Sequence, residues 1–497
     1  MSDQQKSLKQ IMDFRIEKLE SLINNGIDPY PPKFEPTHSS NEITSDYANY
    51  ESKEVVVSGR IMALRKMGKA SFAQLMDSKG RIQIFIRKDD IGDESYSNFK
   101  LLDIGDFIGV EGEVFKTKTG EISIKTTSLT ILAKSIRPLP VVKEKDGQLF
   151  DSFSDKEQRY RNRHLDLILN PEVKETFHKR SMIIRTIRKC LDKRGFLEVE
   201  TPVLQPIYGG ANARPFTTHH NALNQTLFLR IADELYLKRL IIGGIDRVYE
   251  IAKDFRNEGM DRNHNPEFTM LEFYWAYSDY EDCMNLVENL IREAAKRVES
   301  LNVEWGDLKI DLSKPFHRRS FLDLLNEAAG YDLKEFDENK LRSICKEKNI
   351  DLEDNANLGQ ILDELMSELV EPNLIEPTFV VDYPKVISPL AKAHRNGDPH
   401  IVERFELFIG GAEIANSFSE LNDPVDQRKR LEEQASLKDL GDEEAQPIDE
   451  DFIQAMECGM PPTGGVGIGI DRLIMLLTGN RWIKDVILFP TLRSQST

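Results

Sequence analysis

The most constraining feature of the sequence is a stretch from Glu54 to Leu132 in which short β-rich segments follow one another closely. β-Branched and aromatic residues dominate these segments, and turn-forming pairs such as Lys79-Gly80 and Thr119-Gly120 separate them. The segments are Val55–Ile61, Ser71–Met76, Arg81–Ile86, Phe107–Val114 and Glu121–Lys125. Five strands in so short a stretch suit a small barrel that closes on itself, so we expect a five-stranded OB-type β-barrel over residues 54–136.

The pattern of the sequence changes near residue 150. From there to the C-terminus it predicts long segments of mixed α-helix and β-strand. At 497 residues the chain exceeds what one hydrophobic core supports, so several domains are expected. We expect a lead-in helix and Pro-rich segment over 1–53, the barrel over 54–136, a linker over 137–165, and an α+β domain over 166–497. That domain should contain a helical, highly charged insertion at about 322–376.

Charge and composition exclude several classes of protein. The formal net charge of −18 argues against binding nucleic acid through a broad positive field, so any RNA site must be local. No apolar run approaches the roughly 18 residues of a membrane span, and the start lacks a secretory signal, so we expect no membrane association and a cytoplasmic location. The four cysteines form no C-x-x-C pair, which argues against a disulfide framework or a cysteine zinc site.

Three short motifs lie in the C-terminal part. The first, G-F-L-E-V-E-T-P at 195–202, follows an amphipathic helix expected over Met182–Arg194. The second is F-R-N-E at 255–258 with H-N-P-E-F at 264–268, and the third is G-V-G-I-G-I-D-R at 465–472. In this order they resemble motifs 1, 2 and 3 of the class II aminoacyl-tRNA synthetases, in the subgroup for lysine, aspartate and asparagine. The resemblance implies a catalytic domain built on a mainly antiparallel sheet with flanking helices, and a homodimer that joins through Met182–Pro202.

Motif 2 supplies most of the implied ATP site. Arginine suits position 256 because guanidinium offers a planar fork of donors and never loses its proton, so it can clamp a phosphate and a carboxylate. The resemblance implies that Phe268 stacks on adenine and that Arg472 holds the γ-phosphate. The implied ATP-binding residues are Arg256, Glu258, His264, Phe268, Gly469 and Arg472, with Arg256 and Arg472 as the catalytic residues.

The chain departs from the general pattern at two points. It carries Asp471-Arg472 where the general form of motif 3 ends in Glu-Arg, and the subgroup for lysine, aspartate and asparagine commonly shares this aspartate. Asp261-Arg262-Asn263 precede His264, where some bacterial relatives place arginine directly before the histidine. The nucleotide contact of this loop is therefore left open.

A metal site is implied by the segment G-A-E-I-A-N-S-F-S-E-L-N-D at 411–423, between motifs 2 and 3. Strand alternation puts Asn416, Phe418 and Glu420 on one face, whereas Glu413 falls on the opposite face. The resemblance implies that Glu413 and Glu420 both bind Mg²⁺, which requires the strand to bend or bulge between them. Carboxylate oxygens suit this hard ion, which would bridge the ATP phosphates.

The resemblance to the lysine enzymes of this family makes lysine the expected substrate. A lysine pocket needs anionic acceptors at the ammonium end and an apolar or aromatic wall along the methylene stem. Alternation along F-T-M-L-E-F-Y at 268–274 places Glu272 and Tyr274 on the face of Phe268. The implied lysine-binding residues are Gly210, Glu234, Arg256, Glu272, Tyr274, Asn416, Phe418 and Glu420.

The resemblance divides these residues among the ends of the amino acid. Gly210 and Glu234 would bind the α-ammonium group, and Arg256 and Asn416 the carboxylate. Tyr274 and Glu420 would bind the ε-ammonium group, with Phe418 against the stem. The implied reaction activates L-lysine with ATP to lysyl-adenylate and pyrophosphate, then transfers lysine to the 3′-terminal adenosine of tRNA(Lys).

The N-terminal barrel resembles the anticodon-binding barrel of the same subgroup. Phe72 would stack on a splayed base and Gln83 would read a base edge. Arg65, Lys66 and Lys69 would meet phosphates. Barrels of this type also occur in proteins that bind no RNA, and Phe72 could belong to the core, so the expectation depends on the linkage to the catalytic domain.

Two alternatives remain beside a lysine enzyme. An aspartyl- or asparaginyl-tRNA synthetase would share the ATP site, but an aspartate enzyme would need a cation where Glu420 stands. An inactive paralogue that only binds RNA should have lost residues such as Arg256 or Arg472, and both are present.

Overall fold

The computed structural model describes residues 7–140, 143–145, 148–150, 153–333, 336–353, 356–439 and 447–495. Contacts between residues divide the chain into two compact units, Met1–Phe153 and Ser154–Thr497. The division falls inside the segment 137–165 that we expected to act as a linker, part of which lies outside the described residues. Within the described ranges, no helix combines the length and the apolar character that a membrane span requires.

The first unit opens with a helix and a Pro-rich segment, as expected. Helix α1 (Leu8–Asn24) begins after Ser7, whose hydroxyl accepts a hydrogen bond from the backbone N–H of Gln10 in a capping box. The Pro-rich segment packs against the barrel, because the ring of Phe34 lies so close to Gly109 that a Cβ there would come within 2.2 Å of it. Two short helices that the sequence pattern did not predict follow, α2 (Ser40–Ser45) and α3 (Tyr47–Tyr50).

The barrel is closed, in the strand order β1-β2-β3-β5-β4. Its strands are β1 (Glu54–Met67), β2 (Ala70–Met76), β3 (Arg81–Arg87), β4 (Phe107–Lys116) and β5 (Ile122–Ala133). Helices α4 (Lys88–Ile91) and α5 (Asp93–Lys100) connect β3 to β4. Alternate residues of each strand point inward, for example Val55 and Val57 in β1, so the expected OB-type barrel is confirmed.

The second unit is built on an eight-stranded sheet in the order β16-β17-β18-β19-β20-β13-β12-β8. All neighbouring pairs are antiparallel except β16 with β17 and β12 with β8. The strands are β8 (Leu197–Glu198), β12 (Arg247–Phe255), β13 (Glu267–Ala276), β16 (His317–Ser320), β17 (Thr378–Val381), β18 (Arg404–Ile409), β19 (Ala412–Ser419) and β20 (Thr463–Gly469). The expectation of a mainly antiparallel sheet with flanking helices is confirmed.

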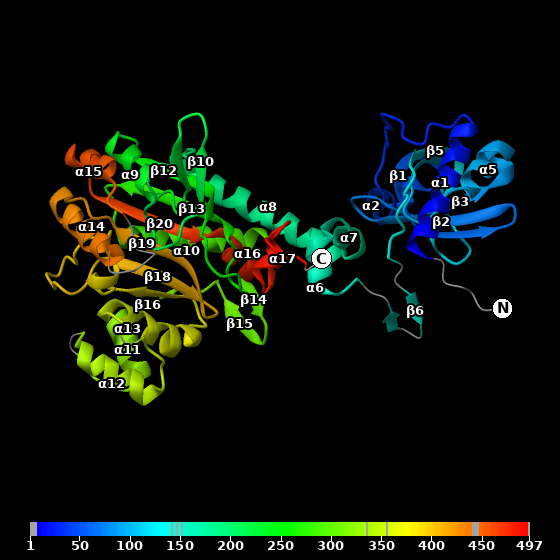
Figure 1. Cartoon of the computed structure of the whole chain (residues 1–497). Coiled ribbons are helices and arrows are strands. Elements are labelled where there is room, and N and C mark those ends of the chain that lie inside the picture. The colour runs from blue at the N-terminus through cyan, green and yellow to red at the C-terminus, as the bar shows by residue number, and fades with distance from the viewer. Residues whose placement is uncertain are drawn as a thin grey trace. The chain divides into compact units, whose positions relative to one another are not determined.

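Helices cover the two faces of this sheet differently (Figure 1). Helices α8 (Pro171–Asp192), α10 (Tyr280–Arg297) and α16 (Ile470–Thr478) pack on one face and bury the largest core with residues such as Phe273 and Val466. Helix α9 (Glu234–Ile242) packs on the other face, against Val248 and Tyr274. On the face beside α9, other helices cover Val380 of β17 and Phe408 of β18, so the middle of this face is left free to form a site.

Helix α8 begins at Pro171 rather than at Met182, where the apolar pattern suggested its start. Proline is well placed in the first turn of a helix, because its missing N–H would have no partner there. Only Val173 is buried in the first half of α8, whereas Ile183, Ile187 and Leu191 are buried in the second half. The first half thus carries too few apolar residues to reveal itself by periodicity.

The helices at the position expected for an insertion lie beside the β16 edge of the sheet, and they share a core with Val380 of β17 and Phe408 of β18 (Figure 1). These helices are α11 (Phe321–Ala329), α12 (Glu338–Lys348) and α13 (Leu358–Leu365), followed by the π-helical turn η1 (Met366–Val370) and the 3₁₀ turn η2 (Glu371–Asn373).

The other elements are β6 (Lys143–Lys145), β7 (Gln148–Phe150), α6 (Lys156–Arg161), α7 (Arg163–Leu169), β9 (Leu204–Gln205), β10 (Thr217–His220), β11 (Gln225–Leu229), β14 (Asn302–Trp305), β15 (Leu308–Asp311), η3 (Lys385–Ile387), α14 (Pro424–Asp439), α15 (Glu450–Glu457) and α17 (Ile483–Val486).

Candidate active site

A cavity of about 370 Å³ opens on the sheet face that carries α9. It is bordered by β13, β19 and β20, which are neighbours in the sheet although they lie far apart in the sequence. Every residue that the sequence suggested for the amino acid, ATP or Mg²⁺ lines this one cavity. These residues are Gly210, Glu234, Arg256, Glu258, His264, Phe268, Glu272, Tyr274, Glu413, Asn416, Phe418, Glu420, Gly469 and Arg472.

Strands β12 and β13 form a hairpin whose register pairs Phe255 with Glu267. Along β13, Phe268, Glu272 and Tyr274 point into the cavity, while Leu271 and Phe273 join the core behind the sheet. The strand therefore alternates as the sequence indicated. Arg256, just after β12, places its guanidinium carbon 5.2 Å from the centre of the Phe268 ring, so a cation and an aromatic face adjoin in the cavity.

Strand β19 contains the bulge that the sequence required. Leu407 of β18 pairs with Ala415, but the next residue, Phe408, pairs with Glu413, so Ile414 is an extra residue in β19. Ile414 and Ala415 consequently both point into the core. Glu413 is turned to the cavity side, where it meets the same space as Asn416.

A chain of polar contacts connects motif 3 to the motif 2 loop. Arg472 Nη1 donates to the backbone oxygen and to Oε2 of Glu413, both at 3.0 Å. Its Nη2 lies 3.0 Å from Nε2 of His264, and Nδ1 of His264 lies 2.7 Å from Oδ2 of Asp261. Because arginine can only donate, His264 accepts at Nε2 and carries its proton on Nδ1, toward Asp261.

Asp471 holds the start of α16 in place. It is buried, and its Oδ1 lies 2.5 Å from Nη1 of Arg180 in α8. Its Oδ2 accepts a hydrogen bond of 2.7 Å from the backbone N–H of Thr269 in β13. The residue before Arg472 thus fixes α16 against both α8 and the sheet. Nothing in the local sequence of α8 marked Arg180 for this role.

The opposite end of the cavity is acidic, and its carboxylates contact a buried cation that sequence reasoning missed, Lys238. Its ammonium group forms ion pairs with both Glu234 and Glu420. Burial opposes the charged form of Lys238, but the two carboxylates raise its pKa above the usual value, so it remains an ammonium ion. Burial raises the pKa of Glu420, and Lys238 counteracts that rise. The i, i+4 spacing of Glu234 and Lys238 on α9 was the available signal.

Glycines allow these side chains to approach the backbone. Gly465 of β20 pairs with Tyr274 on one side and with Phe418 on the other. A Cβ at Gly465 would lie 2.0 Å from Oε1 of Glu420 and 2.5 Å from Cε1 of Tyr274. The glycine in motif 3 therefore makes room for the acidic end of the cavity. Gly210, with a φ of +88°, would place a Cβ 3.0 Å from Cβ of Glu234.

Arg404 is a second cavity residue that sequence reasoning missed. It lies in β18, and its Nε donates to Oδ1 of Asn416 at 3.3 Å. Its guanidinium carbon lies 5.5 Å from the centre of the Phe418 ring. Arg404 thereby orients two residues of the neighbouring strand. Only the pairing of β18 with β19, which the sequence does not reveal, brings them together.

Phe72 lies on the outer surface of the barrel rather than in its core. Register places Arg65, Phe72 and Phe85 in one row across β1, β2 and β3. The rings of Phe72 and Phe85 are 4.9 Å apart, so the surface carries a second aromatic residue that the sequence analysis did not select. The sequence could have indicated Phe85, because it occupies an outward-facing position on β3, as Phe72 does on the neighbouring β2.

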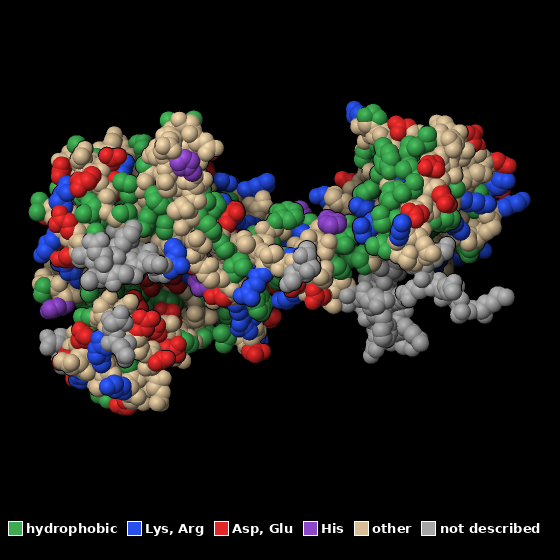
Figure 2. Space-filling view, viewed as in Figure 1, with side chains coloured by type: hydrophobic (Ala, Val, Ile, Leu, Met, Phe, Trp, Pro, Cys, Tyr) green, Lys and Arg blue, Asp and Glu red, His purple; other side chains and the backbone are tan. Residues whose placement is uncertain are grey.

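The polar side chains around this row differ in whether contacts within the protein already engage them. Gln83 donates from Nε2 to Oγ of Ser123 at 2.8 Å. Lys66 donates to the backbone oxygens of Lys100 and Leu102 at 2.7 and 2.9 Å, which competes with the phosphate contact we expected of it. Arg65 and Lys69 are exposed. Lys and Arg side chains are interspersed with Asp and Glu on the face shown in Figure 2, in keeping with a local site.

Comparison with known proteins agrees with both units. A family model of class II tRNA synthetases (D, K and N) matches residues 155–493, and a model of an OB-fold nucleic acid binding domain matches residues 55–132. A lysine–tRNA ligase of Porphyromonas gingivalis is 50% identical over 492 residues, covering 97% of this chain and 85% of the relative.

The buried position of Lys238 leads to a prediction about stability. Lys238→Met should destabilise the second unit by about 3–5 kcal/mol, because two buried carboxylates lose their counter-ion. Lys253→Met is the matched control: its ammonium lies 3.6 Å from Glu267 at a half-exposed surface and should change stability by about 0–1 kcal/mol. Urea unfolding followed by tryptophan fluorescence measures both. Equal, small effects would show that Lys238 does not hold the acidic end together.

Proposed function

Because the chain belongs to the lysine–tRNA ligases within the class II tRNA synthetases, we propose that its cavity binds L-lysine and ATP side by side. The enzyme joins them as lysyl-adenylate, releases pyrophosphate, and transfers lysine to the 3′-terminal adenosine of tRNA(Lys). The observation that carries this proposal is the cavity's polarity. Buried carboxylates and the phenol of Tyr274 gather around Lys238 at one end, and Arg256, beside Phe268, and Arg472, beside Glu413, stand at the other.

Lysine binds with its ε-ammonium group at the acidic end. Glu420 and Tyr274 accept hydrogen bonds from this group, with Glu272 beside them, since Tyr274 donates to Oε2 of Glu272 at 3.0 Å. Phe418 lies along the methylene stem. Lys238 takes Oε2 of Glu420, which leaves Oε1, near Gly465, for the substrate. An aspartate side chain would meet carboxylates here, and in a desolvated pocket that repulsion is strong.

The other end of lysine is held for reaction. Gly210 and Glu234 bind the α-ammonium group, and Arg256 with Asn416 positions the carboxylate. Arg404 fixes the amide of Asn416, so the amide orientation is set before substrate arrives. One carboxylate oxygen of lysine then lies in line with the α-phosphorus of ATP, which lowers the entropic cost of attack.

Activation proceeds by attack of that carboxylate oxygen on the α-phosphorus, with breakage of the bond to the pyrophosphate oxygen. Arg256 stabilises the charge that develops on the α-phosphate. Arg472 holds the γ-phosphate, Phe268 stacks on adenine, and Glu258, His264 and the backbone at Gly469 complete the nucleotide contacts. In the second step the ribose hydroxyl of tRNA attacks the lysyl carbonyl carbon, and AMP leaves.

Glu413 would hold the Mg²⁺ that accompanies ATP, and Glu420, the other implied ligand, lies at the acidic end of the cavity, where it pairs with Lys238. Both provide hard oxygen donors that line the cavity, which fits this ion. The side chain of Glu413 is 39% exposed, whereas Glu420 is buried and paired with Lys238, so Glu413 is the more accessible ligand. When bound, the ion neutralises phosphate charge and favours departure of pyrophosphate.

The barrel binds the anticodon. Phe72, together with Phe85, offers a stacking surface for splayed bases, and Gln83 reads a base edge. Arg65 and Lys69 contact phosphates. This small surface supplies the local RNA site that the acidic chain requires.

The enzyme acts as a homodimer through the segment that contains motif 1. Strand β8 ends the sheet, and the large apolar side chains of Leu197, Val203 and Leu204 are 51%, 38% and 47% exposed around it. An exposed apolar edge of this kind is normally covered. A second copy related by a two-fold axis covers it with the same surface.

Glu420→Gln should reduce lysine-dependent ATP–pyrophosphate exchange by about a hundredfold or more, because loss of a buried charged partner is worth about 3 kcal/mol. Most of the loss should appear in the KM for lysine. Glu432→Gln, an exposed change on α14, is the control and should leave exchange unchanged. Exchange by the Glu420 variant at the normal KM would remove Glu420 from the lysine site.

A double variant, Leu197→Glu with Leu204→Glu, should sediment as a monomer at micromolar concentration, because four charges would be buried across the two-fold axis. The unmodified protein should sediment as a dimer. Leu223→Glu, at an equally apolar position that is 66% exposed on the hairpin of β10 and β11, should remain a dimer. A monomeric unmodified protein would contradict the proposed interface.

Phe72→Ala should weaken tRNA charging about five- to a hundredfold while pyrophosphate exchange stays unchanged, because a lost base–aromatic stack is worth roughly 1–3 kcal/mol. The loss should be greatest at limiting tRNA. Phe107→Ala, which removes another exposed ring of the barrel, is the control. An equal fall in exchange measured without tRNA would mean that Phe72 supports the fold.

A further inference from the structure

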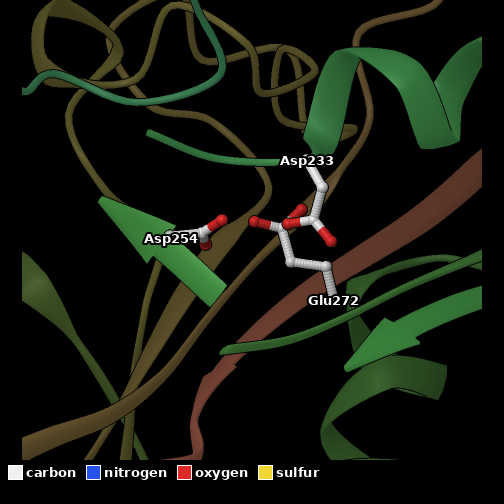
Figure 3. Close-up of side chains that lie close together, drawn as sticks. All are labelled: Asp233, Asp254 and Glu272. Carbon is white, nitrogen blue, oxygen red and sulfur yellow. The ribbon is translucent and has the colours of Figure 1, made fainter. Parts of the chain in front are cut away.

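Three carboxylates meet beneath the acidic end of the cavity. Asp233 directly precedes α9, Asp254 lies in β12 and Glu272 lies in β13. One oxygen from each lies within 4.8 Å of the other two, and Figure 3 shows the carboxylates turned toward one another. All three residues are buried. Strand pairing and the start of one helix therefore bring them together.

Two of these carboxylates lack the hydrogen bonds that burial demands. Among the described residues, neither oxygen of Asp233 and neither oxygen of Asp254 has a hydrogen-bond partner. Asp233 stands where an aspartate usually caps a helix, yet its side chain makes no capping bond because it points to the other two acids. The nearest cation to Asp254 is Arg230, whose Nε is 3.4 Å away and whose Nη1 is bound to Glu250. Buried oxygens without donors indicate a missing partner.

Charge balance points the same way. The buried ionisable groups around the cavity floor are the carboxylates Asp233, Glu234, Glu250, Asp254, Glu272 and Glu420 and the cations Arg230 and Lys238. Six carboxylates and two cations leave a formal excess of four negative charges. The two ammonium groups of a bound lysine would neutralise only two of these four negative charges.

Burial and mutual repulsion act on all three acids. Burial raises the pKa of Asp233 and of Glu272 well above the usual value, and neighbouring carboxylates raise both further. Burial also raises the pKa of Asp254 to about 6, although Arg230 and Arg256 oppose this. Removal from water and mutual repulsion therefore disfavour three unpaired carboxylates at this point, and a bound cation would offset both effects.

We propose that Asp233, Asp254 and Glu272 form a binding site for a divalent, oxygen-preferring cation, separate from the Mg²⁺ that accompanies ATP. Opposite oxygens around Ca²⁺ are roughly 5 Å apart, so the observed spacing admits an ion of this size, whereas Mg²⁺ would draw the carboxylates closer together. Glu272 also lines the cavity, which gives the ion a path from solvent. The bound ion fixes the floor of the cavity by joining α9 to both strands of the hairpin.

Binding is tested with the full-length protein in the absence of ATP and lysine, so the result does not depend on the proposed function. Mn²⁺ is the probe, because the electron paramagnetic resonance signal of free Mn²⁺ decreases when the ion binds. The unmodified protein should bind Mn²⁺ at this site, and Asp254→Asn should lower the affinity at least about tenfold, since even an outer partner of a metal ligand is worth that much. Glu413→Gln, which alters the ATP-side carboxylate, should retain this binding.

Thermal unfolding provides a second measurement that also controls for folding. Ca²⁺ should raise the melting temperature of the unmodified protein and of Glu413→Gln, but not that of Asp254→Asn or Asp233→Asn. If the carboxylates instead share protons, both asparagine variants should melt at a higher temperature regardless of the ion. That result, or Mn²⁺ binding that both variants retain at full affinity, would overturn the proposal.

Discussion

Lys238 forms ion pairs with Glu234 and Glu420 inside the protein, and the acidic end of the cavity depends on this contact. Like charges in a low-dielectric interior repel strongly, so carboxylates that must receive an ammonium group cannot simply be placed together. One internal ammonium group lies between two of them and offsets their repulsion. It leaves a charged surface for a second ammonium group, that of the substrate.

The sheet then determines where the other groups stand. Residues that contact one ligand come from β13, β19 and β20, which are adjacent in space and distant in sequence. Glycine at position 465 is the condition for this convergence, because a side chain there would occupy the place of Glu420 and Tyr274. The order of the strands, together with glycine at position 465, thus places acidic groups at one end of the cavity and arginines at the other.

Local patterns in the sequence were sufficient for the barrel, whereas the mainly antiparallel sheet and the residues that line the cavity were implied by the resemblance to the class II synthetases. Strand alternation together with the implied metal role of Glu413 and Glu420 called for a bend or bulge, and the structure has a bulge at Ile414. Partners contributed by separate elements were not predictable: Arg180 reaches Asp471 from α8, and Arg404 reaches Asn416 across a strand pair. These contacts depend on tertiary geometry, for which a single sequence holds no periodic signal. Lys238 was an exception, since its spacing from Glu234 was visible but its burial was not.

The bulge at Ile414 also bears on how this strand can change during evolution. With the extra residue, Glu413 faces the ligand while Ile414 and Ala415 face the core. Loss of one residue here would reverse the facing of everything on one side of the deletion and carry a carboxylate into the core. Single side chains along β19 can be substituted without changing the facing of their neighbours. The number of residues between Glu413 and Glu420, in contrast, cannot change without reversing which side chains face the cavity. Insertions and deletions in this family should therefore accumulate in the loops that flank the strand rather than within it.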